Sequence, residues 1–186
     1  ITYDSDEGTP VESVTQNYGT AVELPTVTKE GHTFLGWYLD GQKVTSLTVP
    51  AEDITLVAQW SVNSYTLLFD ANGGNDVTSI KDSYGKEIVI PNASREGHTF
   101  AGWIYDGKTY KSGDKYVITA DENVEFVAQW TINQYSITFD EMGGVEIDDI
   151  RKDYGTVINL PAASKEGYTF LGWAVSEGGI VAYEEG

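Results

Sequence analysis

The sequence predicts a mainly β chain built as a tandem array of small modules. Apolar and polar residues alternate with a period of two in several short stretches, and no stretch has the apolar spacing of a long amphipathic helix. A pattern of Tyr-Gly, a Pro six positions after that Gly, and Gly-(His/Tyr)-Thr-Phe-x-Gly-Trp occurs three times. Its tryptophans, Trp37, Trp103 and Trp173, are 66 and 70 residues apart, so the chain holds repeats and not one domain.

The first strand of each repeat is expected where alternation is clearest. These stretches are residues 65–70 and 135–140, and residues 1–4 match the end of the same strand in the first copy. A Gly-containing turn follows each, as at Asp70-Ala71-Asn72-Gly73-Gly74. That sequence begins like a calcium loop but has no third ligand and no glutamate at the twelfth position, so we expect a turn and no metal site.

A closing strand is expected at residues 54–60 and 124–130, which both end in Ala-Gln-Trp. The alignment divides the chain into repeat 1 (1–62), which lacks the start of its first strand, repeat 2 (63–132), which is complete, and repeat 3 (133–186), which lacks the closing strand. Repeat 3 is therefore expected to expose an unpaired sheet edge, through which an otherwise monomeric chain could pair.

The links between repeats are short. Residues 61–64 and 131–134 contain neither Gly nor Pro and are β-capable, unlike flexible Gly/Ser tethers. We therefore expect modules held end to end with limited freedom in an elongated array.

Composition excludes several classes of protein. The 186 residues are 40% hydrophobic and 12% aromatic, which is too apolar for a disordered chain. A formal charge of −18 would repel a phosphate backbone, so nucleic acid is not an expected partner. There is no cysteine for a disulfide and no apolar run long enough to enter a membrane.

The tryptophans are expected in the core, because modules of this size without disulfides need large buried rings. Trp60 and Trp130 end apolar alternations and are assigned to the core with the three motif tryptophans. The only histidines, His32 and His98, align with Tyr168 in repeat 3. They are expected to be half-exposed strand residues, so we predict no catalytic residue and no cofactor.

Tyrosines that differ between repeats are the candidate ligand-binding residues, because tyrosine is enriched at interfaces. They are expected to be exposed, although tyrosine is also common on sheet surfaces. The candidates are Tyr38, Tyr105, Tyr110, Tyr116 and Tyr183.

The combined motifs resemble the internalin-type B-repeat, also called the Listeria–Bacteroides repeat. In repeat 2 they are residues 69–74 (Phe-Asp-x-x-Gly-Gly), Tyr84-Gly85, Pro91, residues 95–103 and Ala128-Gln129-Trp130. Asp6-Glu7-Gly8 and Glu141-Met142 depart from the usual turn sequence. The resemblance implies a β-grasp-like module, similar to ubiquitin and SUMO, found in tandem in secreted or surface-attached bacterial proteins and associated with adhesion.

The sequence and this resemblance together predict a non-enzymatic module of a secreted or cell-surface bacterial protein. It would act as a semi-rigid spacer, an adhesive surface, or both, with a host or cell-surface protein or a glycan as partner. It would lie outside the cell, at the surface or cell wall, with any signal and anchor outside these residues. The alternative is a carbohydrate-binding accessory module of an extracellular enzyme, which requires exposed Trp or Tyr rings on a sheet face.

Overall fold

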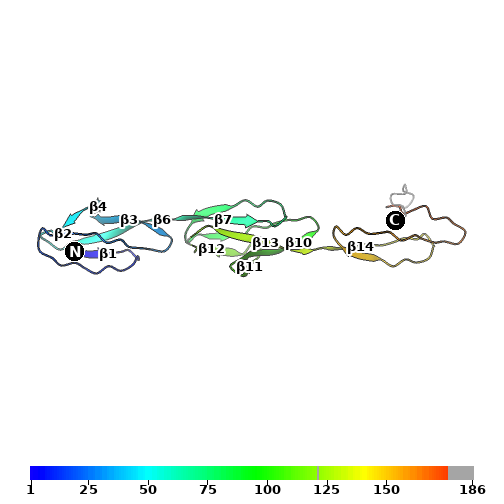
Figure 1. Ribbon diagram of the computed structural model, residues 1–186, viewed down its shortest axis with the longest axis horizontal. Coiled ribbons are helices and arrows are strands. Elements are labelled where there is room, and N and C mark those ends of the chain that lie inside the picture. The colour runs from blue at the N-terminus through cyan, green and yellow to red at the C-terminus, as the bar shows by residue number, and fades with distance from the viewer. Residues whose placement is uncertain (121, 176–186) are drawn as a thin grey trace. The chain divides into compact units, whose positions relative to one another are not determined.

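A computed structural model of the chain describes residues 1–120 and 122–175. All the regular elements assigned in these residues are β-strands, which confirms the mainly β class. The likeness to a β-grasp fold stays a prediction. Most of the strands are labelled in Figure 1. Contacts divide the described residues into two compact units, residues 1–93 with 102–120 and 122–128, and residues 94–101 with 129–175.

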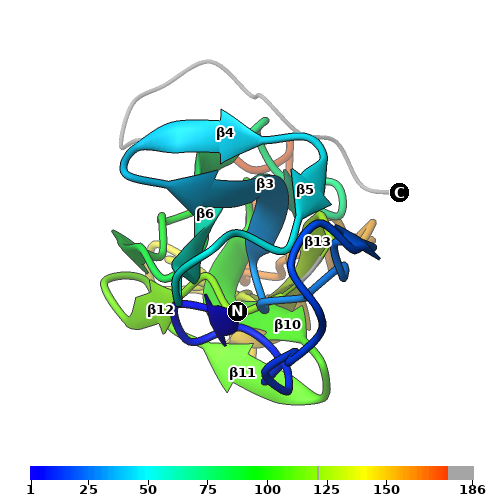
Figure 2. The same cartoon turned by 90° about the vertical axis from the view of Figure 1, so that its left-hand side faces the viewer.

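Repeat 1 contains a four-stranded mixed sheet of order β1-β6-β3-β4, in which β1 runs parallel to β6. Figure 2 shows β3, β4 and β6 of this sheet together. The closing strand β6 therefore lies between the first strand and the strand of the Phe-x-Gly-Trp motif. The strands are β1 (Thr2–Asp4), β2 (Ala21–Val22), β3 (His32–Leu39), β4 (Gln42–Val44), β5 (Leu47–Thr48) and β6 (Thr55–Val62), with β2 and β5 forming a separate pair.

Repeat 2 builds the same arrangement with one more strand, in the order β11-β10-β13-β7-β8. The parallel pair is β7 with the closing strand β13, so the predicted first and closing strands are confirmed. The strands are β7 (Ser64–Asp70), β8 (Ile80–Ser83), β9 (Glu87–Val89), β10 (His98–Tyr105), β11 (Lys108–Tyr110), β12 (Lys115–Val117) and β13 (Val124–Ile132), with β9 and β12 forming a separate pair.

Repeat 3 has a smaller described sheet, the antiparallel pair of β14 (Gln134–Ile137) and β15 (Ile150–Asp153). The predicted first strand ran to Asp140, three residues past the end of β14. In the described residues, β14 has no parallel partner of the kind that β6 and β13 provide, which explains its shorter length. The sequence-based predictions for residues 176–186 concern a segment outside the residues that the structure describes.

The motif tryptophans organise the core. Trp37 and Trp103 are 1% and 0% exposed, so their predicted burial is confirmed, whereas Trp173 is half-buried. Each indole N–H donates to the carbonyl of the motif proline, at 2.7 Å for Trp37 and Pro25. The alternation of β13 has a clear cause, because Val124, Phe126 and Ala128 face the core and the residues between them do not.

The turn after each first strand uses left-handed backbone, as the sequence predicts. Asn72 and Gly73 have φ of 46° and 82°. Repeat 1 uses Asp6 and Glu7 at 48° and 64°, and repeat 3 has a non-glycine residue, Met142, at 50°. The carboxylate of the preceding aspartate holds the turn, since Asp70 Oδ1 accepts the Asn72 N–H at 2.8 Å. These residues therefore have a structural role.

Candidate functional site

The repeats join through a single residue. β6 ends at Val62 and β7 begins at Ser64, so only Asn63 lies between the two sheets. The second link is built in the same way, with Asn133 between the end of β13 at Ile132 and the start of β14 at Gln134. Most of the four-residue links predicted from the sequence therefore belongs to the strands themselves.

Asn63 bonds to both sides of the first junction. Its N–H donates to Gly31 O at 2.9 Å, and its carbonyl accepts the Tyr84 N–H at 2.9 Å. In the side chain, Oδ1 accepts the Thr33 hydroxyl at 2.6 Å and Nδ2 donates to the Tyr65 hydroxyl at 3.3 Å. The residue thus links the Gly-His-Thr segment of repeat 1 to the start of repeat 2.

An aromatic contact closes this junction. A Cβ built on Gly31 would come within 2.0 Å of Tyr84 Cγ, so the ring occupies the space that a side chain there would need. The His32 ring meets the Tyr84 ring edge-on at 6.1 Å. The Tyr84 hydroxyl also donates to the Glu30 carboxylate, and partial desolvation together with this bond raises the pKa of Tyr84. Two motifs, Tyr-Gly of one repeat and Glu-Gly-His of the repeat before it, are therefore partners.

The second junction repeats this geometry bond for bond. Asn133 N–H donates to Gly97 O at 2.8 Å, and Asn133 O accepts the Tyr154 N–H at 2.8 Å. The Thr99 hydroxyl donates to Asn133 Oδ1 at 2.6 Å, and Asn133 Nδ2 lies 3.4 Å from the Tyr135 hydroxyl. The same set of bonds in two places indicates that the junction is encoded by the repeat.

The aromatic contact is also repeated. A Cβ on Gly97 would come within 2.0 Å of Tyr154 Cγ, and the His98 and Tyr154 rings meet edge-on at 6.3 Å. A hydrogen bond from the Tyr154 hydroxyl to the Glu96 carboxylate, with partial desolvation, raises the pKa of Tyr154.

The outer copies of these motifs provide an internal comparison. Tyr18, the counterpart of Tyr84, is 78% exposed. At Gly167, the counterpart of Gly31, nothing among the described residues lies within 4 Å of a built Cβ. The ring-on-glycine contact therefore forms where two repeats meet, and the motif sequence alone does not produce it.

The candidate tyrosines of repeat 2 do not form an exposed surface. Tyr105, Tyr110 and Tyr116 surround Phe126, with ring centroids 5.0, 5.4 and 5.4 Å from it. Tyr116 is only 8% exposed, so its predicted exposure is wrong, because its side chain completes the core beneath β12. Tyr105 and Tyr110 are half-buried. The aromatic excess of this repeat serves packing.

The other two candidates lie elsewhere. Tyr38 is half-buried in β3, where its backbone pairs with Lys43 and Val57. Tyr183 lies outside the described residues. Among the four described candidates, Tyr38 belongs to a strand of repeat 1, whereas Tyr105, Tyr110 and Tyr116 belong to strands of repeat 2.

The two histidines and the two tryptophans of the closing strands are all half-buried. His32 and His98 are half-buried strand residues, as expected, and each ring Nδ1 lies 2.7–2.8 Å from a backbone carbonyl. Trp60 and Trp130 are half-buried, less than the core prediction requires. Within residues 1–120 and 122–175 no cluster of side chains could hold a metal ion, and no helix has the length and apolarity to span a membrane.

Sequence reasoning missed the two asparagines. They stand at the same place in links 61–64 and 131–134, and that repetition is the signal that could have identified them. Short polar residues in strand-like links are common, so the role of Asn63 and Asn133 appears only when their four partners are seen together.

Similarity to known proteins agrees with this organisation. The Listeria-Bacteroides repeat domain matches the chain three times, at residues 1–59, 65–129 and 135–186. A putative membrane protein of Evansella cellulosilytica is 35% identical over 187 aligned positions, which cover 95% of this chain and 28% of that protein. A putative Gly-rich membrane protein of the same organism is 33% identical, covering 93% of this chain and 21% of that protein.

A third relative, Internalin H of Listeria monocytogenes, is 41% identical over 132 positions, which are 65% of this chain and 23% of that protein. The chain thus spans about a quarter of the length of each of these relatives. No solved structure matches it. With three successive matches that together cover nearly every residue, the chain belongs to the Listeria-Bacteroides repeat family.

Proposed function

We propose that this chain is a non-enzymatic, semi-rigid spacer in a secreted or cell-surface bacterial protein. The repeats would be residues 1–62, 63–132 and 133–186. The observation that carries the proposal is the junction, in which Asn63 and Asn133 make the same four hydrogen bonds and a tyrosine ring packs on a glycine of the preceding repeat.

The physical basis is the number of restraints on each link. A typical hydrogen bond contributes about 0.5–1.5 kcal/mol net, and several acting on one residue restrict bending far more than a flexible tether does. Because β6 and β7 are separated by one residue, there is no free segment in which to hinge. Strong negative charge, −18 over the chain, also disfavours folding of the array back onto itself.

The location follows from the relatives. Two are named as membrane proteins and one as an internalin, which supports a place at the cell surface or cell wall. A spacer there would hold other domains away from the cell, toward a host or cell-surface protein or glycan. An adhesive role for the repeats themselves is the weaker half of this proposal, since the tyrosines of repeat 2 pack on Phe126.

Distance measurements between spin labels test the spacer. The chain has no cysteine, so single cysteines at the exposed positions Glu52 and Lys108 can be labelled cleanly on either side of the first junction. A semi-rigid junction gives a narrow distance distribution by pulsed electron paramagnetic resonance. Replacing Asn63 by Gly removes both side-chain bonds and adds backbone freedom, and it is expected to broaden that distribution.

A matched control is Asn17→Gly, which changes an exposed asparagine of repeat 1 beside the exposed Tyr18, away from the link. It is expected to leave the distribution narrow. A native chain whose distribution is as broad as that of Asn63→Gly would show a freely jointed array and refute the spacer.

Glycan binding is the second candidate function, because two indoles on closing strands, Trp60 and Trp130, are half-buried and not enclosed. Against it, Trp60 packs 5.2 Å from Phe34 and donates its indole N–H to Ser5 O at 3.1 Å. A glycan array with the native chain and with Trp60→Phe decides between the two. Saturable binding that Trp60→Phe abolishes would support the carbohydrate-binding module.

A further inference from the structure

The turn after the first strand of repeat 2 contains the sequence Asn72-Gly73. Of the eight asparagines in the chain, only Asn72 precedes a glycine. Because glycine has no Cβ, its backbone nitrogen can approach the side chain of the preceding residue more closely than that of any other residue. When that side chain is an amide, the nitrogen can attack it, so Asn-Gly is the sequence in which asparagine is chemically least stable.

The attacking nitrogen is accessible in the structure. Asn72 and Gly73 are both exposed. The Gly73 N–H makes no hydrogen bond within residues 1–120 and 122–175. Loss of its proton therefore breaks no bond of the described fold, and water or a dissolved base can reach it.

The fold restrains the side-chain amide that would be attacked. Asn72 Nδ2 donates to Ala128 O at 3.1 Å, and Ala128 belongs to the closing strand β13. This bond must open before Asn72 Cγ can meet the Gly73 nitrogen. Because local opening at an exposed turn costs little free energy, the bond slows the reaction and does not prevent it.

The matching turns of the other repeats lack the reacting amide. Asp6 takes the place of Asn72 in repeat 1, and Met142 takes it in repeat 3. The three residues share the left-handed backbone, with φ of 46° for Asn72, 48° for Asp6 and 50° for Met142. The conformation of the turn therefore does not require asparagine, and the amide is a feature of repeat 2 alone.

We propose that Asn72 is a site of spontaneous deamidation, at which the turn of repeat 2 changes irreversibly with time. The Gly73 nitrogen gives its proton to a base and bonds to Asn72 Cγ, while Nδ2 takes up a proton and leaves as ammonia. Water then opens the cyclic imide at either of its two carbonyls. Opening at the backbone carbonyl gives isoaspartate, in which the main chain runs through Cβ and Cγ, and opening at Cγ gives aspartate. In sum, one water is consumed and one ammonia is released.

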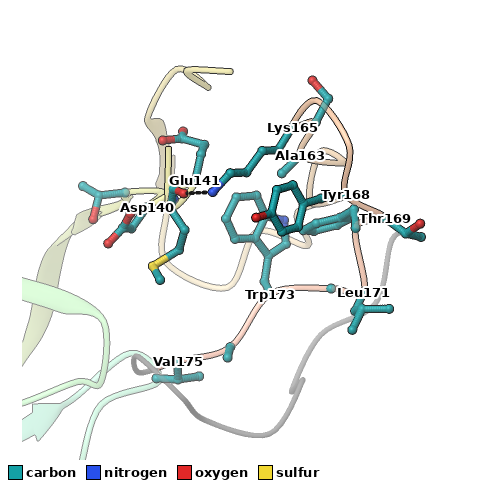
Figure 3. Close-up of a pocket in the computed structure, with 15 residues that line it drawn as sticks. Asp140, Glu141, Ala163, Lys165, Tyr168, Thr169, Leu171, Trp173 and Val175 are labelled. Carbon is teal, nitrogen blue, oxygen red and sulfur yellow. Dashed lines mark hydrogen bonds between the residues drawn. The ribbon is translucent and has the colours of Figure 1, made fainter. Parts of the chain in front are cut away.

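Aspartate at position 72 is compatible with the turn. In repeat 1, Lys29 Nζ lies 3.7 Å from Asp6 Oδ2 and donates to Asp6 O at 2.8 Å. The matching bond of repeat 3, from Lys165 Nζ to Met142 O at 2.6 Å, is the dashed line in Figure 3. Repeat 2 has Arg95 at the place of these lysines, so a new carboxylate would join a turn that already carries a basic residue.

Isoaspartate at this position is not compatible with the turn. The Gly74 N–H closes the turn by donating to Ala71 O at 3.0 Å, and the added backbone atom would lie between these two groups. The bond to Ala128 O is lost as well, because a carboxylate accepts hydrogen bonds and does not donate them. The isoaspartyl product is therefore expected to open the turn and loosen β13.

The site is tested by keeping the folded 186-residue chain at neutral and at mildly alkaline pH over several weeks. Peptide mapping by mass spectrometry locates each deamidated asparagine. Product at position 72 should form several-fold faster than at any other asparagine, and faster at the higher pH, because the attacking nitrogen must lose its proton. The matched control is Gly73→Glu, since repeat 1 has Glu7 at that place with a φ of 64°. It should slow the reaction at position 72 to the rate of the other asparagines.

The effect on the turn is tested by hydrogen exchange of the separated isoaspartyl form. Its peptides from β7 and β13 should exchange faster than those of the native chain. Asn72→Asp has the same charge as the isoaspartyl form but the normal backbone, so its exchange should stay close to that of the native chain.

Three results would overturn the proposal. One is deamidation at position 72 that is no faster than at the other asparagines, and another is an equal rate in Gly73→Glu. The third is equal exchange by the isoaspartyl form and by Asn72→Asp, which would show that the added backbone atom does not open the turn. None of these results alters the distance test across Asn63, so the deamidation site and the spacer stand or fall separately.

Discussion

The ring of Tyr84 lies against the backbone of Gly31, where an added Cβ would stand 2.0 Å from Tyr84 Cγ. Gly31→Ala is therefore expected to break the contact between repeats 1 and 2. The cost has two parts, about 1–2 kcal/mol for an alanine at a φ of +68° and about 1–3 kcal/mol for displacing the ring. Chemical denaturation followed by circular dichroism measures the sum.

Gly19→Ala is the matched control for that prediction. Gly19 has a φ of +76° but nothing within 4 Å of its Cβ position, so it carries the backbone strain without the collision. The loss of stability caused by Gly31→Ala should exceed that caused by Gly19→Ala only by the cost of displacing the Tyr84 ring, about 1–3 kcal/mol. Equal losses of stability for the two variants would mean that the Tyr84 ring is not held against Gly31 in solution.

The Asn63 and Thr33 side chains form a short hydrogen bond of 2.6 Å, and a double-mutant cycle can isolate its contribution. We expect Asn63→Ala and Thr33→Val to be non-additive, with a coupling free energy of about 0.5–1.5 kcal/mol. Unfolding free energies of the two single variants and the double variant give this value. The cycle at Asn133 and Thr99 should give the same result, and zero coupling at both junctions would contradict the assigned bonds.

Much of the fold was predictable because alternation is a strong signal in long strands. Residues 124–130 alternate over seven positions, and β13 forms there with its apolar side chains inward. The left-handed turns were also predictable, since Asn-Gly-Gly after an aspartate favours that conformation. In both cases the local sequence and the final structure agree, so no knowledge of distant contacts was needed.

The site was less predictable because its partners are far apart in sequence. Tyr84 and Gly31 belong to different repeats, and each was recognised only as part of a repeated motif. Tyr116 was misplaced because β12 has three residues, Lys115–Val117, which is too short for alternation to reveal its buried face. Tyr116 is buried because its ring packs on Phe126. The pairing of β9 with β12 and the sheet beneath them bring these two rings together.

Stability is expected to fall at alkaline pH through Tyr116. Burial, with Tyr105 close by, raises the pKa of Tyr116 to about 12, whereas an exposed tyrosine ionises near pH 10. The folded state thus favours the neutral phenol. Its contribution is complete below about pH 10 and is lost as pH rises toward 12, up to about 2–3 kcal/mol in all.

The measurement is denaturant unfolding of the native chain and of Tyr116→Phe at several pH values between 8 and about 12. Tyr116→Phe loses the hydrogen bond with Tyr105 but keeps the ring, so it should be slightly less stable at neutral pH and show a flatter decline above pH 10. Parallel pH curves for the two proteins would show that Tyr116 is not buried as described.

Truncation of the motif tryptophans should lower the free energy of unfolding by different amounts in repeats 2 and 3. Trp103 is fully buried, so Trp103→Ala removes a large ring from a closed core and is expected to cost about 3–5 kcal/mol. Trp173 is half-buried beside an open groove, so less apolar surface is lost, and Trp173→Ala should cost about half as much or less.

Hydrogen exchange read by mass spectrometry assigns each loss to its own repeat, because the strands of repeats 2 and 3 yield different peptides. Trp103→Ala should accelerate exchange throughout β10 and β13, while Trp173→Ala should act on β14 and β15 and leave repeat 2 protected. Equal losses of stability for the two variants would show that Trp173 is as enclosed as Trp103.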